Sequence, residues 1–336
     1  MSLSIIRPGL LTTVQDAGRF GYRQAGVIVS GAMDARALRE ANLLVGNPEG
    51  AAGLEITLRG PTIRFEADHL IALTGADLSP TLNGQTMPLR RPVAVTRDCE
   101  LAFGPARKGY RAYLAVSGGL AVAEVLGSRS TYLRAGIGGF EGRALQAGDV
   151  MPATRPTELG SELRAQLTAA HPAPPWVAAG WSIPPPLYSS PTRAATIRVM
   201  RGPEYERFTE VSQQDFWTQE FTVTPSSDRM GYRLQGPELQ RHNQQEILST
   251  AVTFGTVQVP AAGLPIILMA DHQTTGGYPR IAQVISADFS CLAQLPLGSK
   301  IRFQEVSLAE AQLAYLHQER TLHQLAQAIQ LTACHQ

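Results

Sequence analysis

The stretch Ile266-Ile267-Leu268-Met269-Ala270-Asp271-His272-Gln273-Thr274-Thr275-Gly276-Gly277-Tyr278-Pro279 decides how this chain is interpreted. Its first five residues are an apolar run of strand length that ends at turn residues, which is typical of a buried β-strand. A carboxylate, an imidazole, an amide and two hydroxyls then follow in five consecutive residues. The two glycines after them free the backbone to approach a ligand closely. The stretch predicts a site at a strand end, and a tight turn satisfied by its own polar residues is the alternative.

Similar short β-rich runs, broken by Gly and Pro, recur throughout the chain. They are Thr62–Phe65, Leu70–Thr74, Val93–Thr96, Ala112–Val116, Thr196–Met200, Phe221–Thr224, Gly255–Val259, Ile266–Ala270, Ala282–Ser286 and Lys300–Gln304. Many short strands with frequent turn signals favour β-barrels or sandwiches over alternating βαβ units. We therefore expect a mainly β fold with a few short helices.

Helix signals are clear at two places. Asp34 is suited to cap a helix that ends before Gly46-Asn47-Pro48. Ser307-Leu308-Ala309-Glu310 is a capping box, and it opens an amphipathic C-terminal helix over residues 307–333. We expect this helix to be structural and to pack on a barrel or on a partner.

The clearest break in the chain lies between His171 and Pro191, which holds seven prolines. Such a stretch continues neither a helix nor a central strand. Because 336 residues is long for one domain, we predict an N-terminal β-barrel lobe (1–170), a Pro-rich connector (171–191) and a C-terminal β-barrel lobe (192–306). A weak duplication supports this division, since strands that end at Asp77 and Asp271 occur in the same order in both lobes.

Composition excludes several classes of protein. A net charge of +1 leaves no electrostatic footprint for nucleic acid or an acidic membrane. Lys108 and Lys300 are the only lysines, which removes most candidates for Schiff-base chemistry. Cys99, Cys291 and Cys334 lack metal or redox spacing. Because the sequence has neither a signal-peptide core nor the roughly 18 apolar residues of a membrane span, we expect a cytoplasmic protein.

Standard cofactor motifs are missing. The sequence has no Gly-Lys pair and hence no Walker A motif, and Gly136–Gly142 misses the dinucleotide fingerprint because Glu141 occupies the third glycine position. A zinc-protease pair of histidines is also absent. We predict no metal site, and any nucleotide must use a non-standard site or another subunit.

Three further features carry chemistry. Asp228 beside Arg229 places a carboxylate next to a guanidinium that can bind a planar amide or carboxylate, and a surface turn with a local ion pair is the alternative. Gln258 shares a strand face with Thr256, so it is a ligand contact or part of a polar network. His272 is suited to general acid or base work, and a hydrogen-bonded structural role is the alternative.

Long stretches also match a known family in its order. They are Pro8–Arg19, Ser30–Asp34, Ala41–Asn47, Thr74–Asp77, Tyr113–Gly119, Ser227–Gly231, Gly255–Pro260 and Asp271–Pro279. Together they resemble the KipA proteins, also called the allophanate hydrolase subunit 2 or biotin-dependent carboxyltransferase family, which includes the C subunit of the prokaryotic 5-oxoprolinase. The resemblance covers nearly the whole chain up to about Phe303.

The resemblance implies two cyclophilin-like β-barrel domains and an enzyme that assembles with its A and B subunits, the latter of the KipI type. The implied activity is ATP-dependent opening of 5-oxo-L-proline to L-glutamate, with ATP and Mg as cofactors of the complex. One alternative is a carboxyltransferase-type subunit that acts on urea or a similar amide with carboxybiotin. The other is a regulatory antagonist of a KipI-type kinase inhibitor. No Met-Lys-Met biotinylation site occurs, so no covalently bound biotin is expected, and a homo-oligomer stays open.

These chemistries share a small planar amide or ureido group, which needs convergent donors and acceptors. We hypothesise that Asp228 or Asp271 positions substrate or water, that His272 shuttles a proton, and that the Gly276-Gly277 backbone donates to developing negative charge. The catalytic candidates are His272, Asp228 and Asp271. The substrate-binding candidates are Arg229, Met230, Gln258, Gln273, Thr274, Thr275, Gly276, Gly277 and Tyr278.

Overall fold

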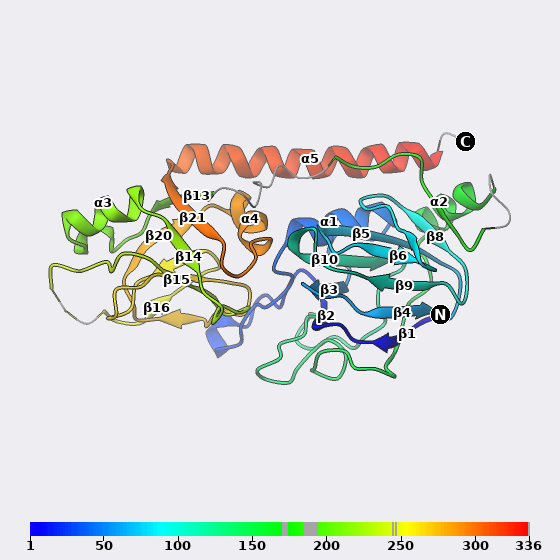
Figure 1. Cartoon of the computed structure of the whole chain (residues 1–336), viewed down its shortest axis with the longest axis horizontal. Coiled ribbons are helices and arrows are strands. Elements are labelled where there is room, and N and C mark those ends of the chain that lie inside the picture. Colours follow the sequence, from blue (N-terminus) through cyan, green and yellow to red (C-terminus); the bar gives the residue numbers. More distant parts are fainter. Residues whose placement is uncertain (170–173, 185–193, 244, 246, 335–336) are drawn as a thin grey trace. The chain divides into compact units, whose positions relative to one another are not determined.

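The computed structural model of the chain describes residues 1–169, 174–184, 194–243, 245 and 247–334. Strands predominate over the five α-helices of these described residues, which confirms the mainly β class (Figure 1). The chain forms two compact units. Unit 1 comprises residues 1–19, 34–186 and 320–336, and unit 2 comprises residues 20–33 and 187–319.

The ten β runs predicted from the sequence all contain a strand. Several strands with shorter or more polar sequences were not predicted, among them β1 (Ser2–Arg7) and β9 (Glu100–Phe103). Exposed charged residues lie at their ends, Arg7 as the last residue of β1 and Glu100 as the first of β9. Pairing with neighbours in the sheet, which no local pattern contains, decides such segments.

Unit 1 holds two six-stranded sheets. The first has the order β11 (Val150–Pro152), β1, β4 (Thr62–Phe65), β9, β6 (Pro80–Leu82) and β7 (Gln85–Thr86). The second has the order β12 (Trp176–Ala178), β8 (Val93–Val95), β5 (His69–Asp77), β10 (Lys108–Val116), β3 (Gly53–Thr57) and β2 (Leu11–Gln15). Alternate residues of both sheets, such as Ile63 and Leu54, share one apolar core.

The predicted first helix is confirmed as α1 (Ala35–Leu44), with Asp34 as its N-cap. The Asp34 carboxylate accepts a hydrogen bond from the Ala37 amide at 3.0 Å, which satisfies a free donor of the first turn. The Asp34 amide donates to the Tyr113 hydroxyl at 2.8 Å, and that hydroxyl donates to Glu55 at 2.7 Å. Burial is the main cause that raises the pKa of Tyr113 well above its ordinary value. This buried chain anchors the start of α1 on β10 and β3.

Unit 2 is built on a closed seven-stranded barrel, which confirms the barrel expected in the second lobe (Figure 1). The order is β13 (Ala195–Arg201), β20 (Arg280–Val284), β17 (Thr256–Gln258), β18 (Ile266–Leu268), β15 (Gly231–Gln235), β14 (Phe221–Val223) and β21 (Lys300–Glu305). A parallel pairing of β13 with β21 closes it, with Ala195 opposite Ile301. Closure leaves no free sheet edge.

Smaller elements surround the barrel. They are η1 (Arg23–Ala25), η2 (Tyr205–Arg207), α3 (Glu210–Thr218), η3 (Ser286–Asp288), α4 (Phe289–Ala293) and the two-stranded pair of β16 (Thr250–Ala251) and β19 (Thr275–Gly276). In the core of this unit, Phe216 stacks on Phe303 with ring centroids 4.4 Å apart. Phe221 completes this aromatic group against both rings.

Residues 20–33 belong to unit 2, although they lie far from the rest of it in sequence. We call residues 20–33 the strap. Its last residue, Met33, is 1% exposed and lies in the barrel core. The predicted lobes, 1–170 and 192–306, did not anticipate the strap, and their boundaries stay predictions. The predicted connector, 171–191, lies in part outside the described residues.

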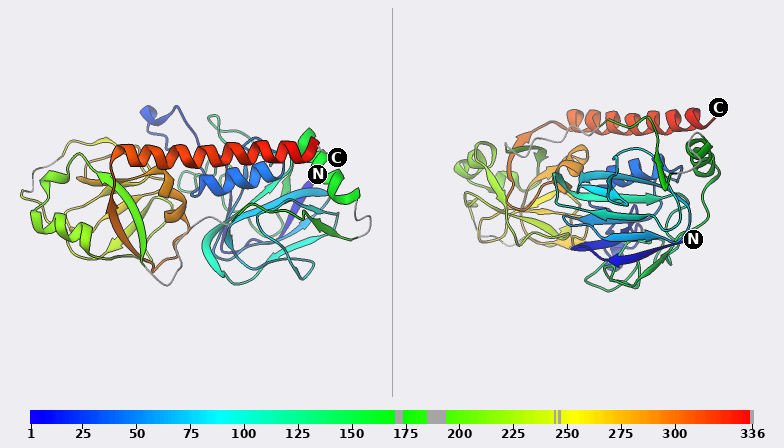
Figure 2. Two further views of the ribbon diagram at one scale, coloured as in Figure 1. Left: turned by 90° about the horizontal axis from the view of Figure 1, so that it is seen from above. Right: turned by 45° about the vertical axis from the view of Figure 1, so that its right-hand side comes forward.

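The C-terminal helix α5 (Leu308–Cys334) is the long red helix in Figure 2. It follows a capping box, as predicted. The Ser307 hydroxyl accepts from the Glu310 amide at 3.2 Å, and the Ser307 amide donates to the Glu310 carboxylate at 2.7 Å. Leu322 is 1% exposed and lies in an apolar cluster of unit 1, whereas Leu316 is 59% exposed. The remaining helix is α2 (Glu158–Ala169).

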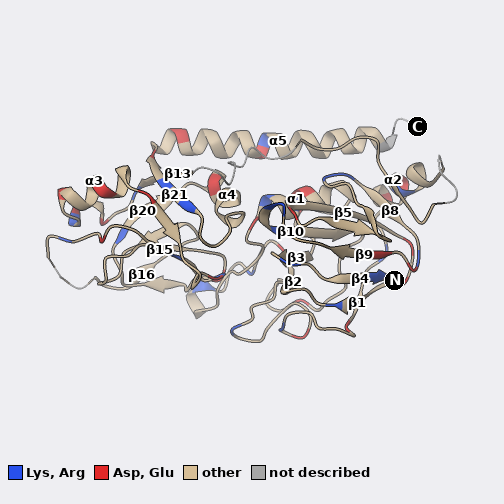
Figure 3. Cartoon of the chain, in the orientation of Figure 1, with Lys and Arg blue, Asp and Glu red and all other residues tan. Residues whose placement is uncertain are grey.

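Charged side chains of both signs are interspersed along the elements of each unit, in keeping with the small net charge (Figure 3). None of the described helices combines the length and the apolar character needed to cross a membrane. This mixture of charges does not indicate a ligand of one charge sign. The buried polar groups are therefore the candidates for a functional site.

Replacing Phe216 by Ala is expected to lower the free energy of unfolding by about 3–5 kcal/mol, because it removes a fully buried ring and leaves a cavity beside Phe303. Chemical denaturation followed by the fluorescence of the adjacent Trp217 measures the change. Val211→Ala is the control, since Val211 lies on the same helix and is 69% exposed. Equal stability of the two variants would contradict the packing described here.

Candidate functional site

The polar run after β18 is anchored by a buried ion pair between Asp271 and Arg229. The Arg229 Nε lies 2.9 Å from Asp271 Oδ2, and Nη2 lies 3.0 Å from Oδ1. Their side chains are only 7% and 6% exposed. The Asp271 amide also donates to the Arg229 carbonyl at 2.8 Å. A buried bidentate pair has a fixed geometry, and loss of either partner would leave an uncompensated charge.

The strap completes this ion pair. Ser30 Oγ donates to Asp271 Oδ1 at 2.7 Å, and the Gly31 carbonyl accepts from Arg229 Nη2 at 2.6 Å. Ser30 has φ 58° and Gly31 has φ 91°, a left-handed turn that is unfavourable for serine and is held by its surroundings. Both Asp271 oxygens therefore already accept hydrogen bonds from protein groups. This arrangement favours a positioning role for Asp271 over direct contact with a substrate.

His272 is buried next to this ion pair, with 5% of its surface exposed. Its Nδ1 lies 2.7 Å from the Met269 carbonyl, which fixes the proton of a neutral ring on Nδ1 and leaves a lone pair on Nε2. Burial lowers the pKa of His272 below its ordinary value of 6.5, and Arg23 lowers it further, whereas the carbonyls of Met269 and Val252 and the Asp271 charge raise it. The ring is therefore neutral near pH 7 and is able to accept a proton.

Arg23, in η1 of the strap, binds the polar run after β18 through a backbone carbonyl. Its Nη2 donates to the Val252 carbonyl and, at 3.3 Å, to the Thr274 carbonyl. The Val252 amide donates to the same Thr274 carbonyl at 3.2 Å. Sequence reasoning marked polar residues on either side of Arg23 but not Arg23 itself. The one local signal was an Arg directly after Gly21-Tyr22, inside an otherwise neutral segment.

Thr256 and Gln258 are both buried on β17, and so is Val257 between them, which lies in the barrel core. Thr256 Oγ1 donates to Gln283 Oε1 at 2.8 Å, so its polar atom is engaged within the barrel. Gln258 is 1% exposed, and its Oε1 lies 3.5 Å from Gln273 Nε2. Gly276 lies directly against the Gln258 amide, because a Cβ on Gly276 would come within 2.4 Å of Nε2.

Asp228 occupies a different setting. It is exposed, and its Oδ1 accepts from the amides of Met230 at 2.8 Å and Gly231 at 3.2 Å. The partner of Arg229 is Asp271, 42 residues away, and not the adjacent Asp228. Asp228 thus forms the turn that presents Arg229, and a catalytic role for it stays a prediction.

The structure brings part of the predicted set together. Direct contacts join Arg229 to Asp271, Gln258 to Gln273 and Gln258 to Gly276, and Arg23 adds Thr274. Met230 joins through its carbonyl, which accepts from the Met269 amide at 3.0 Å. The outer rim of the run consists of Thr275 and Tyr278, which are exposed, and Gly277, which is half-buried.

Residues 12–34, where polar residues and glycines mix with short apolar ones, divide between the two units. In unit 1, the Asp16 carboxylate accepts from the hydroxyls of Ser128 and Ser130 and from the Arg129 amide. Arg19 donates to the Val125 carbonyl at 2.8 Å. These contacts hold the loop after β10 in place. Within this stretch, only the strap reaches the candidate site.

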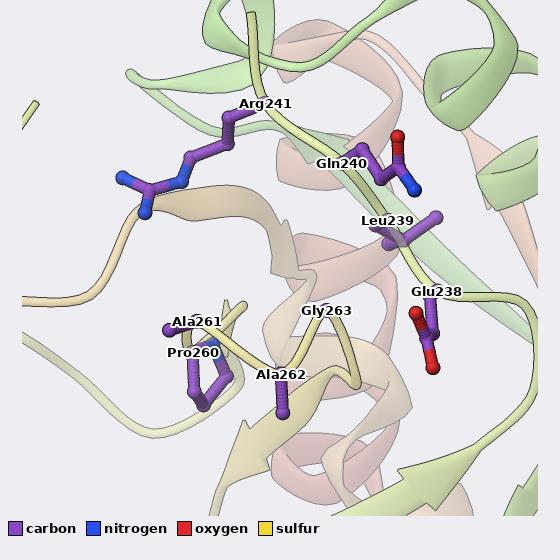
Figure 4. A pocket seen from close by; sticks show the side chains of 8 residues that line it. All are labelled: Glu238, Leu239, Gln240, Arg241, Pro260, Ala261, Ala262 and Gly263. Carbon is purple, nitrogen blue, oxygen red and sulfur yellow. The ribbon is translucent and has the colours of Figure 1, made fainter. Parts of the chain in front are cut away.

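A separate hollow of about 220 Å³ lies elsewhere in unit 2 (Figure 4). Its lining residues are Glu238, Leu239, Gln240, Arg241, Pro260, Ala261, Ala262 and Gly263, none of which is a predicted site residue. No group of three His, Cys, Asp or Glu side chains that could hold a metal ion occurs among the described residues. Burial raises the pKa of the free Cys99 thiol to about 11, so this cysteine is unreactive near neutral pH.

Comparison with known proteins gives consistent matches. The family described as "Carboxyltransferase domain, subdomain A and B" matches residues 25–305. The chain is 44% identical to the 5-oxoprolinase C subunit of Escherichia coli over 324 residues. This matched region covers 96% of this chain and 97% of that protein. The chain is 43% identical over 299 residues to the 5-oxoprolinase C subunit of Haemophilus influenzae, or 89% of each chain. The crystal structure of Kluyveromyces lactis urea carboxylase matches with a TM-score of 0.85 and 29% identity, over 96% of this chain and 29% of that one.

Replacing Arg23 by Met is expected to raise the pKa of His272, because the substitution removes a positive charge that disfavours the imidazolium. Arg23→Lys keeps the charge and should leave the pKa closer to that of the wild type. A titration of the His272 ring by NMR, assigned with a His272→Gln variant, measures both. A His272 pKa that is the same in Arg23→Met and the wild type would show that Arg23 does not act on this ring.

The same lowered pKa predicts a pH dependence of stability. The folded protein favours the neutral ring, so this contribution is fully present above the unfolded pKa of about 6.5 and is lost as pH falls through the lower folded pKa. Unfolding of the wild type should therefore become easier below pH 6.5, and His272→Gln should weaken this dependence. Parallel pH profiles of the two proteins would contradict the prediction.

Proposed function

The chain belongs to the carboxyltransferase domain family, subdomains A and B, and we propose that it is the C subunit of a 5-oxoprolinase. The observation that carries the proposal is 43–44% identity to two proteins of that name, over at least 89% of each chain. The second candidate is a carboxyltransferase-type subunit that acts on urea or a similar amide. It is supported by the urea carboxylase structure at 29% identity.

The proposed reaction is the opening of the lactam ring of 5-oxo-L-proline to L-glutamate, driven by ATP with Mg in an assembly with the A and B subunits. The strand-end site fits the lactam. Gln258 and Gln273 provide amide donors and acceptors, and the neutral ring of His272 is suited to accept or return a proton at Nε2. The backbone of Gly276 and Gly277 is proposed to donate to a developing negative charge.

The cationic groups that the candidate site offers to a triphosphate already have partners. The two guanidinium groups there are engaged, Arg229 with Asp271 and Gly31, and Arg23 with backbone carbonyls. Lys300, at the start of β21, is paired with Glu220 at 3.1 Å. We therefore assign no step to ATP at these residues, and we propose that a partner subunit supplies the phosphate contacts.

The decisive experiment mixes the purified chain with the A and B subunits, ATP and 5-oxoproline, and measures glutamate and ADP. We expect turnover with the complete set and none when this chain is left out. Conversion of urea with carboxybiotin, together with no conversion of 5-oxoproline, would reject the proposal in favour of the second candidate.

Variants in the working complex test the roles of single residues. His272→Gln is expected to lower kcat by roughly 10²–10⁴, the usual contribution of a general acid or base. Asp228→Asn keeps an acceptor for the Met230 amide and removes the charge. Full activity of Asp228→Asn would limit this residue to its turn, whereas a loss comparable to that of His272→Gln would make its charge part of the chemistry. Full activity of His272→Gln would contradict the role of the ring.

A further inference from the structure

Gln258 carries a buried polar group that the fold does not explain. Its Nε2 has no hydrogen-bond partner among the described residues, and the residue is 1% exposed. Its Oε1 has the 3.5 Å contact with Gln273 Nε2, at the outer limit of a hydrogen bond. Turning the carboxamide over would exchange the two atoms and leave the same edge unpaired. Because burial of an unpaired amide is destabilising, this group calls for a functional explanation.

The neighbouring glutamine of the barrel shows that the unpaired edge is not a property of the environment. Gln283 Nε2 donates to the carbonyls of Phe254 at 2.8 Å and Val284 at 3.1 Å. Its Oε1 accepts from Thr256 at 2.8 Å. One strand away, therefore, a carboxamide has a full set of partners, whereas Gln258 has an open donor.

The open edge of Gln258 is covered by a thin layer. The position of a Cβ on Gly276 would be 2.4 Å from Nε2, so there is no room for a side chain between this backbone and the amide. Gly276 is half-buried and Thr275 is exposed. The layer is held by the two-residue pairing of β19 with β16 and by the Arg23 contact to Thr274. Because β16 and β19 form a sheet separate from the seven barrel strands, a displacement of Gly276 does not require the barrel to open.

We propose that the Gln258 carboxamide pairs with the cis-amide edge of a small cyclic amide, and that Gly276 moves aside to admit it. In a five-membered lactam the ring holds N–H and C=O on the same side. A carboxamide presents the complementary donor and acceptor, so two parallel hydrogen bonds form. Urea presents the same edge. The inference rests on the proposed function for its substrate class, and it assigns recognition of the ring amide to one side chain.

Two probes isolate this edge in the full chain. 2-Pyrrolidinone has both the N–H and the C=O, whereas γ-butyrolactone replaces the N–H by oxygen. In NMR titrations, 2-pyrrolidinone is expected to shift the side-chain resonances of Gln258 and the amide of Gly276. γ-Butyrolactone is expected to bind about tenfold more weakly, since it leaves the Gln258 oxygen facing another acceptor.

Matched variants separate recognition from structure. Gln258→Met should abolish the preference for the lactam over the lactone. Gln283→Met removes a nearby amide of the same size and should keep that preference even if stability falls, because the ratio of two affinities cancels a general loss. Gly276→Ala should abolish lactam binding by crowding Nε2, since the added Cβ would lie 2.4 Å from it.

The outcomes are distinct from those of the turnover assay. No shift of the Gln258 resonances at saturating 2-pyrrolidinone, or an unchanged lactam preference in Gln258→Met, overturns the inference even if the assembled enzyme converts 5-oxoproline. Shifts at Gln258, together with a lactam preference that disappears in Gln258→Met, support the inference even if the assembled enzyme does not convert 5-oxoproline. That absence of conversion would reject the proposed function but not the inference. Imidazolidin-2-one is a cyclic urea with the same amide edge. If it binds more tightly than the lactam, this supports recognition of that edge by Gln258 and indicates a urea-like ligand.

Discussion

The buried ion pair of Arg229 and Asp271 is the constraint on which the candidate site depends. Two charges removed from water are tolerable only with near-ideal geometry and additional hydrogen bonds. Here Ser30 and the Gly31 carbonyl supply those bonds from the strap. The ion pair therefore fixes three segments at once: the turn before β15, the strap, and the start of the polar run after β18. A substitution in any one of these segments should affect the other two, because all three contact the same ion pair.

The residues proposed to carry the chemistry lie next to this ion pair. His272 directly follows Asp271, so its ring is placed by the ion pair and by the Met269 carbonyl. Burial and the nearby Arg23 keep the ring neutral by lowering its pKa. Gln258 approaches from β17 with an open donor beneath Gly276. The ion pair holds these groups in place, and the half-buried Gly276 lies over Gln258. This arrangement suits a small ligand whose recognition depends on a few polar groups.

The sequence was sufficient where structure is decided locally. A few neighbouring residues determine the structure in three such cases: the apolar run Ile266–Ala270, the Asp34 cap and the Ser307 capping box. The failures all concern distance along the chain. Arg229 pairs with a carboxylate 42 residues away and not with its neighbour, and Ser30 bonds to Asp271 across 241 residues. Asp77, which ends the corresponding strand of the first lobe, accepts a hydrogen bond from the Ser79 amide at 2.8 Å, and the duplication of the two lobes stays a prediction.

A crystal structure of the assembled enzyme with 5-oxo-L-proline and no ATP tests the central claim most directly. The account predicts that the lactam lies in unit 2, with its amide edge within about 3 Å of the Gln258 carboxamide and with Gly276 displaced from its position in the free chain. His272 Nε2 should face the ligand, and the ion pair of Arg229 with Asp271 should be unchanged. A lactam bound in another subunit or in unit 1, with Gly276 still against Gln258, would contradict the account.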